Sequence, residues 1–462
     1  MSSSPTGGRE GSLEAPTRHP LDWRSDSFYD ETALGRELER VFDICHGCRR
    51  CFSLCQAFPT LFDAIDATDT GELAAVDKKA YWQVVDHCYL CDMCFMTKCP
   101  YVPPHPWNVD FPHLMLRAKA ARARRQGLPL RDRVLASTDA VGRLAGIPVV
   151  VEVVNAVNAS RLGRALLAKT LGVDAGAPLP TYFARTARKR LARRRPAATT
   201  VTATPETRGK VALFTTCYGN RNEPQLVEDL AAVFEHNGIP VRLTPRERCC
   251  GMPRLELGDL EGVDALKAQN IPVLRTLVAE GYDIIAPVPS CVLMFKQELP
   301  LMYPDDADVQ AVRARIFDPF EYLMLRHRAG LLRTDFRQPL GKVSYHVPCH
   351  LRVQNIGLKT RDVLRLVPGT SVDVIERCSG HDGTYGVKRA FRAASEKIGR
   401  PVAQRIEKAA PDHYSSDCPM AGEQLASLID ARGGGGEAAP RERSLPREPE
   451  HPLRLLRHAY GI

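Results

Sequence analysis

The sequence predicts an α+β protein of several domains, in which a helical amino-terminal domain precedes a duplicated α/β domain. Three observations predict this fold class. Eight of the fifteen cysteines fall in two short runs within the first hundred residues. From Lys210 onward, short apolar runs alternate with stretches of helical periodicity, as in βαβ units with a mostly parallel sheet. The same order of strands, helices and cysteines recurs after about 120 to 130 residues, which indicates an internal duplication.

The two amino-terminal cysteine runs have the spacing of a protein that holds two [4Fe–4S] clusters. In such proteins three sulfurs of one run converge on one cluster, and the fourth reaches across to the other. The runs are Cys45-x2-Cys48-x2-Cys51-x3-Cys55 and Cys88-x2-Cys91-x2-Cys94-x4-Cys99-Pro100. We therefore predict one cluster on Cys45, Cys48, Cys51 and Cys99, and the other on Cys88, Cys91, Cys94 and Cys55. The gap before Cys99 is one residue longer than the standard three.

Two other uses of these cysteines are less consistent with the pattern. Structural zinc uses CxxC pairs and rarely takes three cysteines from one CxxCxxC run. Disulfides need an oxidising compartment, and the first twenty residues lack the apolar core of a secretory signal. The pattern thus favours iron–sulfur ligation in a helical, ferredoxin-like domain.

Composition predicts a cytoplasmic globular protein of two or three domains. The chain has 462 residues, 44% of them hydrophobic and 25% charged. No run approaches the ~20 apolar residues of a membrane span; the nearest, Ile147 to Val157, is short and contains Glu152 and Asn155.

Changes in composition divide the chain into six segments. We expect a disordered amino terminus (1–33), the helical two-cluster domain (34–125), a helical basic connector and linker (126–206), the two α/β repeats (207–335 and 336–431), and a disordered tail with a short carboxy-terminal segment (432–462). Within the two-cluster domain, helices are expected over Glu31–Ile44 and Asp77–Val85. The repeats are expected to have strands at 210–216, 239–243 and 283–288, and at 343–347, 372–375 and 413–418.

The cysteines of the two repeats also align. The first repeat has Cys217, the sequence Cys249-Cys250-Gly251, and Cys291; the second has Cys349, Cys378-Ser379-Gly380, and Cys418. Each lies just beyond a predicted strand, at the edge where open α/β sheets bind ligands. A lone cysteine is often only a small buried hydrophobe, but that explanation fits matched positions in a repeat badly.

With these motifs the chain resembles the iron–sulfur CCG-domain family. That family includes the subunit designated C of anaerobic glycerol-3-phosphate dehydrogenase, the glycolate oxidase iron–sulfur subunit and heterodisulfide reductase. The resemblance covers roughly 42–117 and 210–428, and its most specific parts are Tyr345-His-Val-Pro-Cys349-His350 and Gly383-Thr-Tyr-Gly386. It implies that a full CCG motif carries five cysteines and binds a non-cubane [4Fe–4S] cluster.

Both repeats depart from this five-cysteine pattern. Met294 stands at the fifth position of the first repeat, where a thioether is a weak ligand. Cys217, Cys249, Cys250 and Cys291 still suffice for one cluster, so a third cluster and an empty site both stay open. In the second repeat Ser379 and Ala421 replace cysteines. The remaining Cys349, Cys378 and Cys418, flanked by His346, His350 and His381, resemble a Cys3His zinc site, and zinc or no metal is expected there.

A basic run lies in the connector, with seven Lys or Arg residues between Arg185 and Arg195. It suits a solvated helix face, or docking to an anionic membrane or a partner. Nothing else in the sequence supports nucleic-acid binding.

These features predict an iron–sulfur electron-transfer subunit. No glycine-rich flavin or nicotinamide fingerprint follows a strand, so substrate oxidation is assigned to a flavoprotein partner, with a quinone or similar acceptor at the cytoplasmic face of the membrane. The resemblance alone implies the glycerol 3-phosphate or glycolate type of dehydrogenase. Two alternatives stay open: a catalytic subunit that reduces a disulfide, as in heterodisulfide reductase, and a soluble relay to a peroxide-reducing partner.

Overall fold

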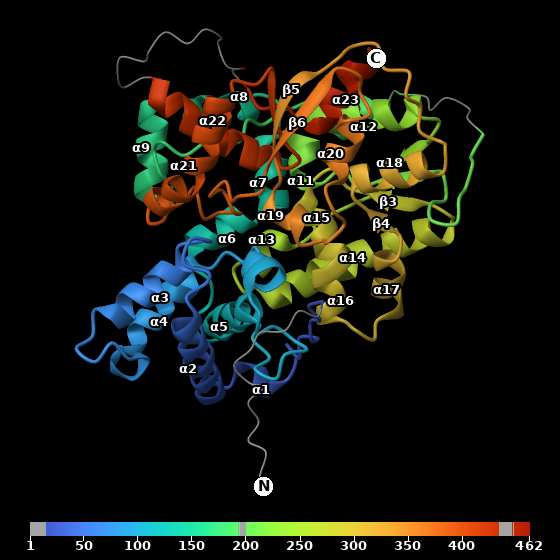
Figure 1. The fold of residues 1–462 in the computed structure, drawn as a ribbon. Coiled ribbons are helices and arrows are strands. Elements are labelled where there is room, and N and C mark those ends of the chain that lie inside the picture. The colour runs from blue at the N-terminus through green and yellow to red at the C-terminus, as the bar shows by residue number, and fades with distance from the viewer. Residues whose placement is uncertain (1–14, 193, 195–199, 434–445, 447) are drawn as a thin grey trace. The chain divides into compact units, whose positions relative to one another are not determined.

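Two units, each with its own set of cysteines, make up the structure. The computed structural model describes residues 15–192, 194, 200–433, 446 and 448–462 (Figure 1). The first unit comprises the chain up to Leu128 together with Pro253–Glu261 and Leu301–Pro304. The second comprises Pro129–Met252, Gly262–Pro300 and Asp305–Ile462.

The first unit is helical around its cysteines. Its main elements are α1 (Asp26–Tyr29), α2 (Glu31–Cys48), α3 (Ala57–Asp66), η2 (Leu73–Ala75), α4 (Lys78–His87), η3 (Cys94–Lys98) and α5 (Phe111–Gln126). Asp30 caps α2 by accepting a hydrogen bond from the Ala33 N–H. Phe58 packs against Phe111 with ring centroids 4.7 Å apart, and Phe42 lies on the same ring. The two predicted helices are confirmed as α2 and α4.

Helix α2 runs further into the first cysteine run than expected. Its last residue is Cys48, and the C-cap residue Arg49 takes the left-handed conformation with φ 48°. Cys45 and Cys48 therefore lie three residues apart on the last turn, on one side of the helix. The apolar residues Leu38, Val41 and Phe42 keep this helix buried up to the cysteines.

The expectation of a disordered amino terminus is wrong for residues 15–33, whereas residues 1–14 lie outside the described part. Arg18 is buried and binds Asp92 at 2.5 Å and Asp110 at 2.8 Å. Its guanidinium also lies 4.5 Å from the centroid of the Phe95 ring. Burial alone would raise the pKa of Asp110, but Arg18 and His113 hold it well below its usual value. A buried ion pair thus ties the amino-terminal segment to the loop that carries Cys91 and Cys94, and composition alone does not reveal it.

The second unit contains two parallel sheets of matching topology. The first has the order β2-β1-β3-β4, with β1 at Val211–Leu213, β2 at Val241–Leu243, β3 at Asp283–Ile285 and β4 at Ile316–Phe317. The second has the order β6-β5-β7, with β5 at Gly341–His346, β6 at Thr370–Ile375 and β7 at His413–Ser416. In each, the first strand is central and the next two flank it. The six predicted strands and the duplication are confirmed; β4 was not predicted.

Helices cover these sheets and connect their strands (Figure 1). They are α6 (Leu130–Ala136), α7 (Thr138–Ala145), α8 (Val150–Ala159), α9 (Arg161–Thr170), α10 (Ala187–Leu191), α11 (Cys217–Arg221), α12 (Pro224–His236), α13 (Met252–Leu255), α14 (Leu260–Ala279), α15 (Pro289–Leu293), η4 (Met294–Glu298), α16 (Leu299–Met302), α17 (Ala307–Arg313), α18 (Pro319–Arg328), α19 (Cys349–Arg352), α20 (Lys359–Leu364), α21 (Arg392–Ala409), α22 (Pro419–Gly433) and α23 (Pro452–Tyr460). Helices α13, α14 and α16 contain residues of both units.

One apolar core joins the two repeats. Leu213 of β1, Phe234 of α12 and Tyr345 of β5 belong to the same buried cluster. Tyr460 of α23 also belongs to it, and its hydroxyl donates a hydrogen bond to the Arg333 carbonyl at 2.7 Å. The short carboxy-terminal segment expected after the tail contains α23, which buries an apolar face against α12 (Figure 1). Residues 434–445 and 447 lie outside the described part.

Three described members of the basic run pair with acidic side chains of the first repeat. Arg190 binds Glu228 at 3.2 Å and Arg194 binds Glu235 at 2.6 Å. Arg188 lies 3.7 Å from Glu247. Much of this charge is therefore offset within the unit; Arg193 and Arg195 lie outside the described residues.

No single helix of the described residues is long and apolar enough to cross a membrane. Helices α7 and α8 reach that length and hydropathy only as a pair, and the pair is bent by 108°.

We predict that Arg18→Ala destabilises the first unit. It leaves Asp92 and Asp110 without their buried cation, which costs about 3–5 kcal/mol of unfolding free energy. Anaerobic chemical denaturation measures the change, with Arg36→Ala on the exposed face of α2 as the control. Equal stability of the two variants would contradict this role of Arg18.

Candidate cysteine sites

The structure gathers the eight amino-terminal cysteines into the two groups that their spacing predicts. Burial raises the pKa of the Cys45 thiol well above its ordinary value, and the neighbouring Cys99, Cys51 and Cys48 raise it further. Burial likewise raises the pKa of the Cys55 thiol, with added contributions from Cys91 and Cys88. Ligation of iron by the two groups stays a prediction.

The two groups adjoin each other. Burial raises the pKa of the Cys94 thiol. Four neighbouring cysteines raise it further: Cys51, of the first group, and Cys91, Cys88 and Cys55. No disulfide joins any of the fifteen cysteines, all of which lie within the described ranges. Thiols crowded in this way resist ionisation, and bound iron would supply the positive charge that makes several buried thiolates favourable.

Backbone donors already point at several of these sulfurs. Hydrogen bonds from the N–H groups of Ala57 and Phe58, in the first turn of α3, partly offset the effect of burial on the pKa of Cys55. The Tyr101 N–H does the same for the pKa of Cys99. Such N–H···S bonds stabilise thiolate ligands and set cluster potentials. These residues therefore fit an iron–sulfur group.

The side chain of Lys119 binds the backbone at the start of the second cysteine run. Its ammonium donates to the carbonyl oxygens of Cys88 and, at 3.1 Å, of Glu256. Burial raises the pKa of the Cys88 thiol to about 12, and the charge of Lys119 counteracts this rise. A buried cation beside Cys88 favours the thiolate of this predicted ligand, and nothing in the sequence singled Lys119 out.

The four cysteines of the first repeat converge where the strands of its sheet end. Cys217 opens α11 after β1, the pair Cys249 and Cys250 follows β2, and Cys291 lies in α15 after β3. Cys249 lies beside Cys217 and Cys250, and Cys250 lies beside Cys291. These neighbouring thiols lower the pKa of Cys249 well below its ordinary value, whereas they raise the pKa of Cys250. The set can therefore hold one metal group among four sulfurs.

Helix α7 of the connector completes this site, and the sequence carries no signal for it. Asp139 Oδ2 accepts a hydrogen bond from the Cys249 backbone N–H at 2.7 Å. Thr138 lies beside Cys217 and Cys249 and lowers the pKa of both thiols. Both residues stand more than seventy positions before Cys217, so only the tertiary fold reveals their role.

Met294 fills the position of the fifth cysteine as a packing residue. Its side chain is fully buried. Its methyl carbon would lie 3.4 Å from a Cβ built on Gly251, whose φ of +106° favours glycine. The thioether thus closes the space beside the Cys250–Gly251 turn.

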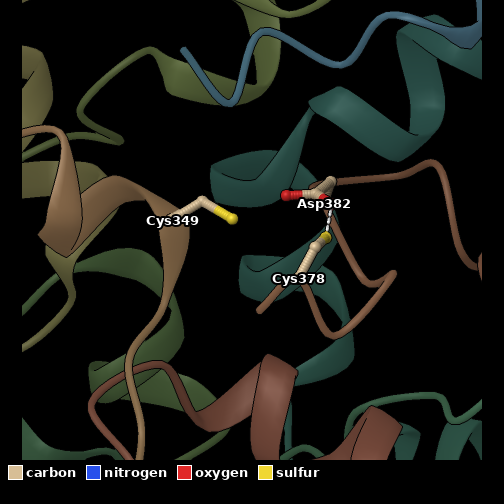
Figure 2. Close-up of side chains that lie close together, drawn as sticks. All are labelled: Cys349, Cys378 and Asp382. Atoms are coloured by element: carbon tan, nitrogen blue, oxygen red, sulfur yellow. Dashed lines mark hydrogen bonds between the residues drawn. The ribbon is translucent and has the colours of Figure 1, made fainter. Parts of the chain in front are cut away.

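The second repeat brings together Cys349, Cys378 and an unpredicted residue, Asp382. Their ligand atoms all lie within 4.8 Å of one another (Figure 2). Cys418 is not part of this group; burial raises the pKa of its thiol to about 12. The spacing of the cysteines does not reveal Asp382, because it lies in an irregular loop.

The histidines of the second repeat are also outside the group, contrary to the predicted Cys3His arrangement. His350 Nδ1 bonds with Ser290 Oγ at 2.8 Å. His346 bonds with Ser416 Oγ and the Arg377 carbonyl. Burial and the nearby His350 lower the pKa of His381 to about 4. Two of the five residues predicted to bind metal, Cys349 and Cys378, therefore come together.

Comparison with known proteins agrees with the duplication. The family model of the cysteine-rich domain CCG matches residues 211–296 and residues 343–425. These are the two repeats that contain the parallel sheets. Both repeats therefore match the cysteine-rich domain CCG, in agreement with the resemblance to the iron–sulfur CCG family.

The chain is also similar to subunits of a dehydrogenase and of a reductase, and to a lactate utilization protein. It is 29% identical to the subunit designated C of the anaerobic glycerol-3-phosphate dehydrogenase of Escherichia coli, over 71% of this chain and 77% of that protein. It is 28% identical to the subunit designated B of the fumarate reductase (CoM/CoB) of Methanothermobacter marburgensis, over 49% of this chain and 43% of that protein. It is also 26% identical to lactate utilization protein A of Bacillus pumilus, over 45% and 87% respectively. These similarities support an electron-transfer role.

We predict that Asp139→Ala weakens the first-repeat site. The substitution leaves the Cys249 N–H without its acceptor, which costs about 1–3 kcal/mol. The midpoint of thermal unfolding should fall, and iron bound in addition to the amino-terminal groups should be lost. Glu152→Ala, exposed on α8, serves as the control. An unchanged midpoint and iron content would refute this role of Asp139.

Proposed function

We propose that this chain is the iron–sulfur electron-transfer subunit of a flavin-dependent dehydrogenase complex. It would pass electrons from a flavoprotein partner, through two [4Fe–4S] clusters, toward a quinone or similar acceptor. The observation that carries this proposal is the grouping of the eight amino-terminal cysteines into two adjoining sets of four. The names of two relatives, each a subunit of a larger enzyme, support a partner for this chain.

The chain's own residues would hold, shield and tune these groups. When bound, iron–sulfur clusters supply one-electron transfer. Cys45, Cys48, Cys51 and Cys99 would hold one, and Cys88, Cys91, Cys94 and Cys55 the other. The backbone donors to Cys55 and Cys99, together with the buried ammonium of Lys119, favour the thiolate state. Phe58 and Phe111 are buried and form part of the apolar packing of this unit.

The first repeat would hold a third cluster on Cys217, Cys249, Cys250 and Cys291. Their convergence, and the hydrogen bond that the Cys249 N–H donates to Asp139, support it. The buried thioether of Met294 at the fifth position indicates a site with four thiolate ligands.

We predict about eight irons per chain from the two amino-terminal clusters, and about twelve with a cluster in the first repeat. Anaerobic iron and acid-labile sulfide analysis, together with EPR, measures both. Cys291→Ala should remove only the last four irons, and Cys55→Ala should perturb only the amino-terminal signals. Colourless protein that contains zinc and no sulfide would overturn the proposal.

A second candidate function is reduction of a disulfide or related acceptor at the first-repeat site. The similarity to a CoM/CoB-dependent reductase over about half of this chain favours it. Disulfide reduction by the purified chain, with an artificial electron donor and no partner, would establish this activity. A soluble relay to a peroxide-reducing partner is a third candidate.

Exposed apolar residues of the connector support peripheral binding at the cytoplasmic membrane. Leu162 is 86% exposed and Val149 is 75% exposed. With Leu144, Ile147, Val153 and Leu166 they form what we call the apolar connector face, on and between α7, α8 and α9. Arg143, Arg161 and Lys169 are exposed on two of these helices. Apolar side chains flanked by cations fit an anionic lipid surface, whereas three arginines of the basic run are paired with acidic side chains.

We predict that Val153→Ser with Leu162→Ser releases the protein from membranes. The double variant should lose most of its co-sedimentation with phosphatidylglycerol vesicles, because it buries less apolar surface in the bilayer. Val201→Ser, which replaces a 44% exposed valine elsewhere, should leave it unchanged. Equal binding to vesicles by all three proteins, or no binding by the wild type, would exclude this face as the membrane contact.

A further inference from the structure

We propose that the second repeat binds one zinc ion through Cys349, Cys378 and Asp382. Figure 2 shows the two thiols and the carboxylate directed toward a common point. Their ligand atoms lie within 4.8 Å of one another, and both cysteines are buried. This site is separate from the clusters and does not depend on the electron-transfer role.

Strand register places the two cysteines together. In the β5–β6 pair, His346 is level with Ile375, the last residue of β6. Each chain segment then reaches its cysteine three residues later, at Cys349 and Cys378. Since parallel strands present their carboxyl ends at one edge of the sheet, the two thiols meet there.

The loop after Cys378 folds back to place the carboxylate. Gly380 has φ +79° and lies so close to α21 that an added Cβ would be 2.1 Å from the Ser395 carbonyl oxygen. The Ser395 hydroxyl donates to the Gly380 carbonyl at 2.7 Å. Asp382 itself has φ 34°, an uncommon conformation for a residue with a side chain. An aspartate that keeps this uncommon backbone conformation beside two cysteines indicates a functional site.

The donor set suits a single ion of the zinc class. Zinc takes thiolate and carboxylate ligands, with ligand atoms about 3.7 Å apart in a tetrahedral site. Cys378 Sγ and Asp382 Oδ2 are already 3.1 Å apart. Two thiolates and one carboxylate do not make the four-thiolate set of a four-iron cluster: Ser379 and Ala421 replace two cysteines, and Cys418 lies outside the group.

The fourth position is left to water or to His381. His381 belongs to the same loop, and its Nε2 is buried without a hydrogen-bond partner among the described residues. A buried nitrogen of this kind is costly unless it finds a ligand or a donor. Backbone support comes from the Gly380 N–H, which donates to Cys378 Sγ at 3.2 Å and favours the thiolate.

Metal analysis of protein from zinc-replete, anaerobic culture tests this site. The wild type should contain about one zinc per chain in addition to its iron. Cys378→Ala and Asp382→Asn should lower zinc affinity at least about 10-fold with iron and sulfide unchanged. The matched control is Cys418→Ala, which removes the buried cysteine outside the group and should retain zinc.

Cobalt replacement and a rescue variant keep the test independent of folding. Cobalt at a thiolate site gives intense charge-transfer absorption, which the wild type should show and Cys378→Ala should lack. Asp382→Cys restores a third strong ligand and should bind zinc as the wild type does. The proposal is overturned if the wild type contains no zinc, if Asp382→Asn and Cys378→Ala retain it, or if Cys418→Ala loses it. Unchanged iron in these variants leaves the electron-transfer proposal intact.

Discussion

The cost of burying ionised sulfur governs the cysteine sites of this protein. Burial raises the pKa of Cys45, Cys55 and Cys94 in the first unit. A thiolate taken out of water is unfavourable unless a cation or several hydrogen-bond donors compensate its charge. The N–H groups of α3 supply part of that compensation, and the ammonium of Lys119 adds to it at Cys88. Bound metal would balance the remaining negative charge of the thiolates.

In the second unit, the cysteine sites lie at the carboxyl ends of parallel strands. Both repeats place their first strand at the centre of the sheet, which brings residues distant in sequence to one edge. The first repeat gathers four thiols there, whereas the second gathers two of its three thiols together with a carboxylate. One architecture thus supports two different donor sets, and the exchange of cysteine for Ser379 and Ala421 changes the chemistry without changing the sheet.

Segments outside the repeated domains are structural parts of each unit. Arg18 joins the amino-terminal segment to the second cysteine run through two buried carboxylates. Helix α23 closes the shared core of the repeats with Leu453 and Tyr460. The connector contributes Asp139 to the first-repeat site and presents an apolar face to solvent on the helices that follow. Removal of any of these segments would therefore alter packing or ligand support.

The sequence by itself determined the elements that depend on local pattern. Cysteine spacing was enough to sort Cys45 and Cys99 into one group and Cys55 and Cys88 into the other, and apolar periodicity located six strands of the duplicated sheets. Only the tertiary structure decided which distant side chains serve each site. Asp382, rather than Cys418 or a histidine, lies beside Cys378, because the loop turns back at residues in the left-handed conformation. Cysteine spacing does not predict that turn. Long-range ion pairs and helix docking have no local sequence signature, since the energy of each comes from a partner far along the chain.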